Sequence, residues 1–232
     1  SKQFDTIEHQ SQHREFVCHT GTYRGKRVTA LSTGIGTDNI DITVNELDAL
    51  VNIDLETRTE REIKKSLQLI RIGTCGILQP QIPIHSYIVT THAFGLDNVA
   101  HFYDLAFSEE ESEMCQRIAK FLGLPESINP YFVSSDLALT FQFTEDFCFP
   151  GITITSSGFY GPQGRVLRLA LQYPDLVNDL PTFRYGNHLI TNFEMETSAI
   201  YGLGKSLNHY CLSLNAIVAN RVAQTFSKDG AK

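Results

Sequence analysis

Two apolar runs that each end in a glycine-rich turn constrain the fold of this chain more than any other feature of its sequence. Residues 27–37, RVTALSTGIGT, are predicted to form a buried strand that ends in glycines, and residues 67–76, LQLIRIGTCG, repeat the pattern. Between them, residues 37–52 carry apolar side chains at helical spacing. Strand, tight turn and helix therefore follow one another, as in proteins that layer helices on a sheet.

The rest of the chain continues this alternation. Residues 108–122 are predicted to form a helix that Ser108 caps, whereas residues 54–65 are almost entirely polar or charged and are expected to be a solvated insertion. Further strands are expected in SYIVTTHAFG, PYFVSSD, GITITSSGFYGPQGR, LITNFEMETSAIYGLGKSL and HYCLSLNAIVAN, the fourth of which continues into a helix. Because no repeat or linker interrupts the pattern, an α/β fold in one domain over residues 1–232 is predicted.

Composition disfavours several classes of function. A formal net charge of −7 leaves no global basic surface, so neither nucleic acid nor an anionic membrane is an expected partner. The sequence contains no apolar run as long as a membrane span, and its polar opening, SKQFDTIEHQ, has no signal-peptide core. A cytoplasmic protein is therefore predicted.

Signatures of metals and organic cofactors do not stand out. The five cysteines lack a CxxC pair and are expected to be buried thiols in a reducing compartment, and the eight histidines show no metal-ligand spacing. The turn GIGTDN lacks the third glycine of the dinucleotide-binding pattern GxGxxG. We expect neither a metal nor an organic cofactor.

Arg71 is a charge inside the apolar run LQLIRIG, where it is costly without a partner. A buried salt bridge would account for it. Alternatively, the guanidinium, the hydroxyl of Thr74 and the backbone amides of GTCG are donors that suit a phosphate. Glycine turns at strand ends are also where open α/β sheets bind ligands, but the residues alone leave the two interpretations about equal.

Gln163 and Arg165 lie two residues apart in the Gly/Pro-rich loop GFYGPQGR, so in an extended loop they point to the same side. A loop arginine is usually only solvated. Here, an amide that donates and accepts, beside a guanidinium that only donates, complements the acceptor, donor, acceptor edge of uracil. Cytosine would place donors against donors, which a buried site penalises.

Glu194 and Glu196 of NFEMET project in different directions if a helix begins here. Thr191 and Glu194 have the spacing of a capping box, which predicts a structural role for Glu194. Glu196 is therefore the first candidate to accept hydrogen bonds from a vicinal diol.

Taken together and in this order, STGIG, RIGTCG, FYGPQGR, NFEMETSA and IVANR resemble the nucleoside phosphorylase I family, and within it the pyrimidine branch of uridine phosphorylases. The match runs from HREF at 13–16 to IVANR at 217–221. STGIG and RIGTCG are shared across the family, whereas FYGPQGR together with NFEMET is typical of the pyrimidine branch. The resemblance implies a three-layer αβα sandwich with a mixed central β-sheet.

The resemblance also implies roles for particular residues. They are phosphate ligands (Arg14, Arg71 and Thr74), base contacts (Phe159, Gln163, Arg165 and Arg221, the last through water) and ribose contacts (Glu194, Met195 and Glu196). Arg71, Gln163 and Arg165 would be the catalytic groups, and Glu196 would hold the 2′-hydroxyl. Because Arg14 would reach the phosphate of a neighbouring subunit, a homodimer or a larger homo-oligomer with shared sites is expected.

The implied reaction is the phosphorolysis of uridine, and of deoxyuridine as a further candidate, to uracil and ribose 1-phosphate or its deoxy form. Purine-cleaving relatives carry an aspartate after the last core strand, and IVANR has none. A purine nucleoside phosphorylase, a nucleosidase on the same fold and an inactive nucleoside-binding homologue remain alternatives.

This chain departs from the family at both ends and at one ion site. It is expected to lack the family's N-terminal strand with a Gly-Asp-Pro-x-Arg phosphate loop, and a C-terminal helix. Either the sequence is incomplete or the copy has a damaged phosphate site. The family's potassium site matches at Glu15, but Asn39 stands where a serine is expected, so no ion is predicted.

Overall fold

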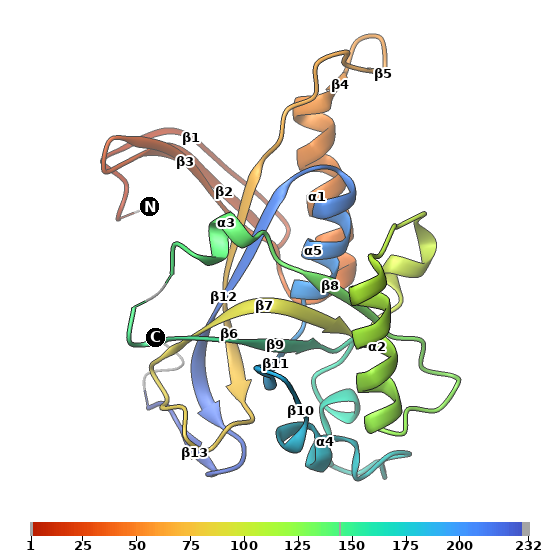
Figure 1. The fold of residues 1–232 in the computed structure, drawn as a ribbon. Coiled ribbons are helices and arrows are strands. Elements are labelled where there is room, and N and C mark those ends of the chain that lie inside the picture. Colours follow the sequence, from red (N-terminus) through yellow and green to blue (C-terminus); the bar gives the residue numbers. More distant parts are fainter. Residues whose placement is uncertain (1, 144, 229–232) are drawn as a thin grey trace.

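A mixed eight-stranded sheet forms the centre of the computed structural model, which describes residues 2–143 and 145–228. The strands run in the order β13-β12-β6-β11-β9-β7-β8, with β10 paired to β11 (Figure 1). Their bounds are β6 (Gln68–Ile77), β7 (Tyr87–Gly95), β8 (Tyr131–Ser134), β9 (Cys148–Thr155), β10 (Arg184–Tyr185), β11 (His188–Glu194), β12 (Tyr210–Asn220) and β13 (Thr225–Phe226). The predicted mixed central sheet is thus confirmed.

The sheet also closes on itself. Strand β12 pairs in parallel with β6 on one side and antiparallel with β7 on the other. Strand β6 pairs with β11, β11 with β9, and β9 with β7. Five strands therefore form a ring, β6-β12-β7-β9-β11, which the sequence did not predict because closure depends on pairing between distant strands.

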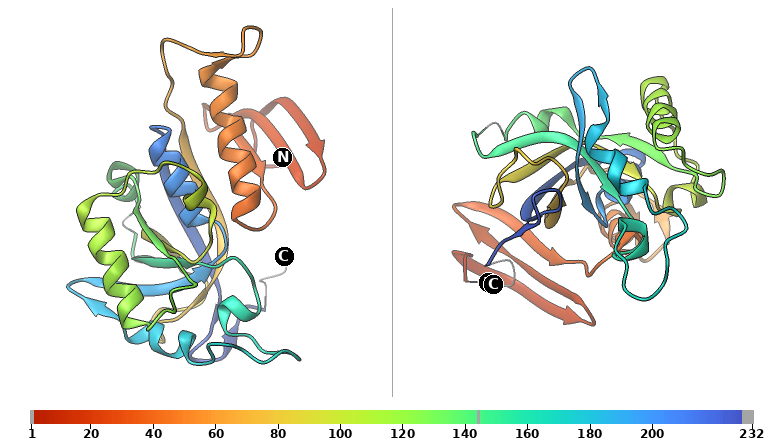
Figure 2. Two further views of the ribbon diagram at one scale, coloured as in Figure 1. Left: turned by 90° about the vertical axis from the view of Figure 1, so that its right-hand side faces the viewer. Right: turned by 90° about the horizontal axis from the view of Figure 1, so that it is seen from below.

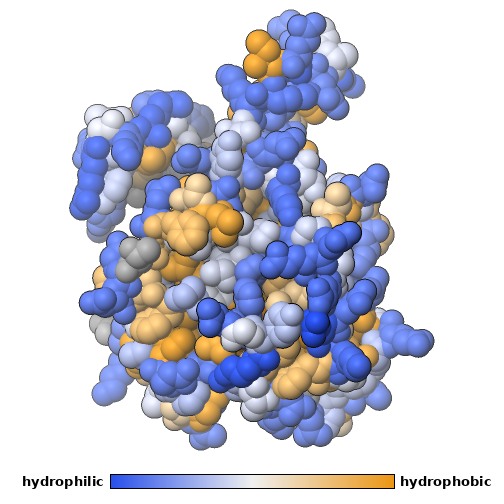
Figure 3. Space-filling view, viewed as in Figure 1, coloured by the Kyte–Doolittle hydropathy of each residue, from blue (hydrophilic) through white to orange (hydrophobic). Residues whose placement is uncertain are grey.

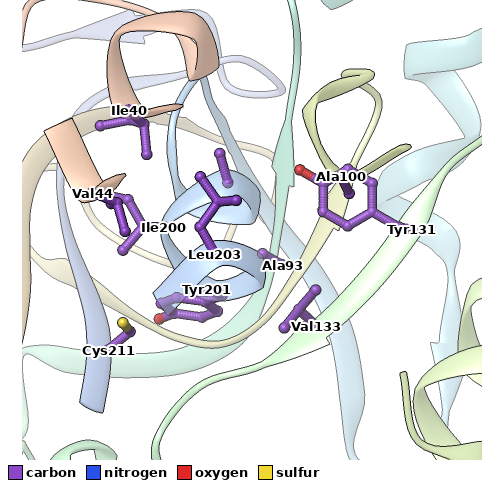
Figure 4. Close-up of a cluster of buried hydrophobic side chains, with 11 residues drawn as sticks. Ile40, Val44, Ala93, Ala100, Tyr131, Val133, Ile200, Tyr201, Leu203 and Cys211 are labelled. Carbon is purple, nitrogen blue, oxygen red and sulfur yellow. The ribbon is translucent and has the colours of Figure 1, made fainter. Parts of the chain in front are cut away.

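Helices cover the sheet on both faces, which confirms the predicted three-layer arrangement. Helices α1 (Thr37–Asn52) and α5 (Thr197–Ser206) pack against each other on one face, and Figure 4 shows Ile40 of α1 near Ile200 and Leu203 of α5. Helix α2 (Glu109–Phe121) covers the other face. On β8, Val133 packs in the α1–α5 core and the adjacent Phe132 packs in the α2 core, as strand alternation requires.

The start of α2 follows the sequence prediction. Ser108 is the N-cap: its side chain accepts a hydrogen bond from the backbone of Glu111, and the Glu111 side chain accepts one from the backbone of Ser108. This reciprocal pair is a capping box, which satisfies two backbone N–H groups that a helix start otherwise leaves free.

A separate antiparallel sheet holds β1 (Thr6–His13), β2 (Phe16–Tyr23) and β3 (Lys26–Ser32) beside the main body (Figure 2). The sequence predicted that the strand in residues 27–37 would be buried, and this was wrong. Every residue of β3 except Leu31 is exposed. An apolar run indicates a strand, but it does not say whether another layer covers that strand.

The charged segment 54–65 is exposed, as predicted, apart from the half-buried Asp54, and it includes most of the hairpin of β4 (Ile53–Asp54) and β5 (Thr59–Glu60). The hairpin projects beyond α1 and is mostly hydrophilic (Figure 3). Short helices complete the described elements: η1 (Val99–Phe102), α3 (Leu137–Thr140), η2 (Gly161–Gln163), α4 (Leu176–Asp179) and η3 (Leu180–Thr182). Within the described ranges, no helix has the length and apolar character needed to cross a bilayer.

Candidate active site

Arg71 lies on β6 with its side chain folded back over Gly73. A Cβ atom at Gly73 would come within 2.3–2.5 Å of the guanidinium atoms, so only glycine leaves room for this arrangement. The Arg71 side chain is 14% exposed. The sequence RIG therefore encodes a nearly buried cation held flat against its own strand.

Two carboxylates surround this guanidinium. Arg71 forms an ion pair with Glu196, and its Nη2 lies 3.4 Å from Oε2 of Glu194. Burial by itself would lower the pKa of Arg71, but Glu194 and Glu196 raise it above its ordinary value. Arg71 therefore forms the salt bridge that one interpretation of the sequence predicted. Because its side chain still reaches the protein surface, it is also accessible to a phosphate, as the other interpretation requires.

Glu194 has a structural role, although not the one predicted. Its side chain is 1% exposed and accepts hydrogen bonds from the hydroxyls of Thr155 and Thr197 and from the backbone N–H groups of Glu196 and Thr197. Glu194 itself therefore caps the start of α5. The proposed capping box with Thr191 is wrong: the Thr191 hydroxyl lies inside β11, within hydrogen-bond distance of the Ile152 carbonyl and Asn192 Oδ1. The same burial argues for Glu194 as a positioning residue rather than a ribose contact.

Glu196 connects the glycine turn of residues 34–36 to Arg71. It occupies the N-cap position of α5, and its Oε1 accepts a 2.8 Å hydrogen bond from the backbone N–H of Gly36. Gly36 has a φ of 102°, a conformation that side chains other than hydrogen rarely allow. The structure thus brings together STGIG, RIGTCG and NFEMET, which are far apart in sequence.

The loop before α4 holds the predicted base contacts. Nη1 of Arg165 donates to Oε1 of Gln163 at 2.5 Å and to the carbonyl of Phe159 at 2.6 Å. The guanidinium carbon of Arg165 lies 3.8 Å from the centre of the Phe159 ring. Gln163 is 3% exposed, so its amide is fixed in a buried position, whereas Phe159 is half exposed.

Arg221 joins this cluster from the end of β12. Its Nη2 donates to the Gln163 carbonyl at 2.5 Å, and its buried Nη1 has no hydrogen-bond partner in the described structure. Burial lowers the pKa of Arg221 to about 10, with a further contribution from the positive charge of Arg165, and burial also lowers the pKa of Arg165. Within residues 2–143 and 145–228, neither guanidinium is ion-paired with a carboxylate.

The arginine cluster and the Arg71 cluster occupy neighbouring strands. Gly76 of β6 pairs with Phe193 of β11. Arg221 lies over Phe193, with its guanidinium carbon 5.3 Å from the ring centre, and a Cβ on Gly76 would lie 3.3 Å from its Cδ. Phe193 and Glu194 are consecutive in β11, so this strand contributes one residue to each cluster.

For the remaining predicted residues, the structure shows no hydrogen bond or ion pair to Arg71 or to the arginine cluster among the described residues. Thr74 is exposed on β6, at an odd spacing from Arg71 and therefore on the opposite side of the strand. Met195 is partly buried between the two glutamates.

Arg14 is exposed at the turn between β1 and β2, in the left-handed region with a φ of 51°. A Cβ on Gly34 would lie 3.0 Å from Cγ of Glu15, so this turn lies beside the glycine turn.

The sequence analysis missed Asn215, whose Oδ1 accepts a 2.5 Å hydrogen bond from Arg71. Its signal in the sequence was an amide inside the mostly apolar run CLSLNAIVA, and the structure buries it completely. Ser213, also completely buried, lies 3.4 Å from the same guanidinium nitrogen. In the described part of the chain, no group of three or more histidine, cysteine or acidic residues could hold a metal ion.

A cavity of about 390 Å³ lies elsewhere, between α2 and the residues before β8. Phe107, Cys115 and Tyr131 are among its lining residues, and none of the arginines described above borders it. The candidate site rests instead on the convergence of Arg71, Arg165 and Arg221 with their polar partners.

Comparison with known proteins shows the family to which this chain belongs. The model of the phosphorylase superfamily matches residues 1–230. A uridine phosphorylase from Thermococcus kodakarensis is 30% identical over 95% of this chain and 68% of its own length. A DeoD-type purine nucleoside phosphorylase from Bacillus subtilis is 25% identical over 90% of this chain and 71% of its own length.

Among solved structures, a Trypanosoma brucei nucleoside phosphorylase that shows uridine phosphorylase activity superposes with a TM-score of 0.88. It is 30% identical to this chain, and the match covers 98% of this chain and 82% of the trypanosomal one. A match to the family model over nearly the whole sequence, together with this likeness in structure, shows that the chain belongs to the phosphorylase superfamily.

Proposed function

We propose that this protein is a cytoplasmic uridine phosphorylase, which splits uridine, and deoxyuridine as a second substrate, with inorganic phosphate. The products are uracil and ribose 1-phosphate or its deoxy form. The observation that carries the proposal is the pair of guanidiniums, Arg165 and Arg221, which converge on Gln163 and form no ion pair with a carboxylate of the described residues.

Gln163 supports recognition of uracil. Its Oε1 already accepts from Arg165, which fixes the orientation of the amide. A carbonyl oxygen accepts two hydrogen bonds, so Oε1 retains capacity for the N3–H of uracil, while Nε2 and the guanidinium are donors for the flanking carbonyls. Cytosine presents a different pattern and would leave buried donors unpaired.

The arginine pair suits the charge that develops during the reaction. As the bond between C1′ and N1 breaks, its electron pair moves onto the uracil ring, and ribose takes on oxocarbenium character. A phosphate oxygen then bonds to C1′ from the opposite face, which completes ribose 1-phosphate, and the uracil anion takes up a proton from water to give uracil. The positive charges of Arg165 and Arg221 repel each other, and a delocalised uracil anion would relieve that repulsion.

The phosphate half of the site motivates a proposal about assembly. Two carboxylates already face Arg71, so its charge alone does not favour the approach of a phosphate dianion. A second cation would correct this balance. We assign this role to Arg14 of a second copy of the chain, in a homodimer or a larger homo-oligomer, because Arg14 projects at an exposed turn.

The test is uracil release from uridine with and without phosphate, beside the same assay with inosine. Phosphate-dependent release of uracil supports the proposal. Release at the same rate without phosphate indicates a nucleosidase, and preference for inosine indicates a purine phosphorylase, an alternative favoured by the B. subtilis relative. Uridine binding in calorimetry without turnover indicates an inactive nucleoside-binding protein.

A further inference from the structure

A chain of buried polar side chains runs around the five-stranded ring and ends at Arg71. Each strand of the ring contributes one member, in the order in which the strands are paired. The members are Arg71 (β6), Asn215 (β12), Thr90 (β7), Thr153 (β9) and Asn192 (β11). The last four are completely buried. Burying a polar side chain costs free energy unless it is hydrogen-bonded. An unbroken series of such side chains through the core therefore suggests a function.

In this series of side chains, each member donates a hydrogen bond to the next, starting from Arg71. Arg71 can only donate, and it donates to Oδ1 of Asn215 at 2.5 Å. Nδ2 of Asn215 then faces Oγ1 of Thr90 at 2.9 Å.

The far end of the chain fixes the same direction. Thr153 donates to Oδ1 of Asn192 at 2.9 Å, and its single proton is then used. The Thr90 hydroxyl, 2.6 Å from that of Thr153, must therefore donate to it and accept from Asn215. The amide of Asn215 cannot flip, because its Nδ2 would then face the guanidinium of Arg71, which has no acceptor for it.

Asn215 is also neutral, which matters beside Arg71. The guanidinium already contacts Glu194 and Glu196, so a third carboxylate would make the local charge more negative. An amide oxygen supplies the same acceptor geometry without adding a charge. Position 215 thus combines a fixed acceptor with the absence of a negative charge.

We propose that Asn215 is a positioning residue for Arg71, held in register by Thr90 and Thr153, and that its neutrality sets the affinity for phosphate. This inference rests on the proposed phosphorolysis. Asn215 does not touch the reacting atoms; it acts through Arg71, which would contact the phosphate.

The test compares Asn215→Asp and Asn215→Ala with a matched control, Asn52→Ala. Asn52 is 4% exposed and bonds to Asp48 and to the Lys65 carbonyl at the end of α1, away from the site. Thr90→Val removes the next hydroxyl along the chain. The measurements are KM for phosphate, KM for uridine, kcat and the melting temperature.

We expect Asn215→Asp to raise KM for phosphate roughly 10- to 100-fold, with a much smaller change in KM for uridine. Asn215→Ala should raise KM for phosphate less than Asn215→Asp does, and Thr90→Val should raise it least. Asn52→Ala should lower the melting temperature without changing either KM. If both KM values rise together, or KM for phosphate is unchanged in folded Asn215→Asp, the inference is wrong. Wild-type protein without phosphate-dependent turnover would instead overturn the proposed function.

Discussion

Arg71 and Glu196 form an ion pair that links the middle of β6 to the first residue before α5. The other oxygen of Glu196 accepts from the N–H of Gly36, so one carboxylate connects a strand, a helix start and a glycine turn. The side chain of Glu196 is 9% exposed, which leaves it an edge from which to bind a ligand. We infer that the edge facing solvent holds the 2′-hydroxyl of ribose.

Glu196→Gln is expected to lower kcat/KM for uridine about 10- to 100-fold, because a charged hydrogen bond to the ribose diol and the pairing with Arg71 are both weakened. Deoxyuridine lacks the 2′-hydroxyl, so its kcat/KM should fall less. Steady-state assays with uridine and deoxyuridine measure the loss of kcat/KM for each nucleoside. Equal losses for the two nucleosides would exclude a direct contact between Glu196 and the 2′-hydroxyl.

Arg165→Ala and Gln163→Ala are each expected to lower kcat for uracil release roughly 100-fold, since removal of one preorganised donor to a developing anion typically costs about 3 kcal/mol. Arg168→Ala is the matched control, because Arg168 is an exposed arginine in the same loop. The measurement is the initial rate of uracil release from uridine in phosphate buffer for each variant. Near wild-type rates for both variants would refute the assignment of the base site.

Subunit mixing tests whether Arg14 acts across an interface. Arg14→Ala and Arg71→Ala should each be nearly inactive alone. After unfolding and refolding together, the mixture should recover about a quarter of wild-type activity, because half of the dimers are mixed and each holds one complete site. If Arg14 serves its own subunit, no mixed dimer has a complete site and the mixture stays inactive. Light scattering that shows an active monomer would also contradict the proposal.

Glu111→Gln is expected to lower the free energy of unfolding by about 2 kcal/mol at neutral pH. Burial favours the neutral form of Glu111, yet Lys205 and two backbone N–H groups donate to the carboxylate and lower its pKa from 4.5 to about 2. A lowered pKa means that the contribution is complete above pH 4.5 and is lost as the pH falls towards 2.

Denaturant unfolding at pH 7 and pH 3 measures this effect. The difference between wild type and Glu111→Gln should shrink at the lower pH. Glu113→Gln is the control, because Glu113 forms an exposed ion pair with Arg117 on the same helix and should change stability little. A difference that does not depend on pH would show that the Glu111 charge contributes nothing.

Local sequence determined much of this protein. The alternation of strands and helices, the capped start of α2 and the exposed hairpin of residues 54–65 all depend on neighbours within a few residues. The expectation that the side chains of Gln163 and Arg165 lie on the same side holds for the same reason, since only Gly164 separates them. Periodicity, caps and short spacings act over one turn or one loop, so the amino-acid order contains them directly.

The tertiary structure decided what each buried charge contacts. Arg71 and Asn215 are 144 residues apart, and their contact follows from the parallel pairing of β6 with β12. The expected cap by Thr191 failed because its backbone remains in β11, which left Glu194 to accept from the start of α5. Strand pairing and ring closure depend on the whole core at once, and for this reason short-range patterns could nominate candidate residues but could not assign their partners.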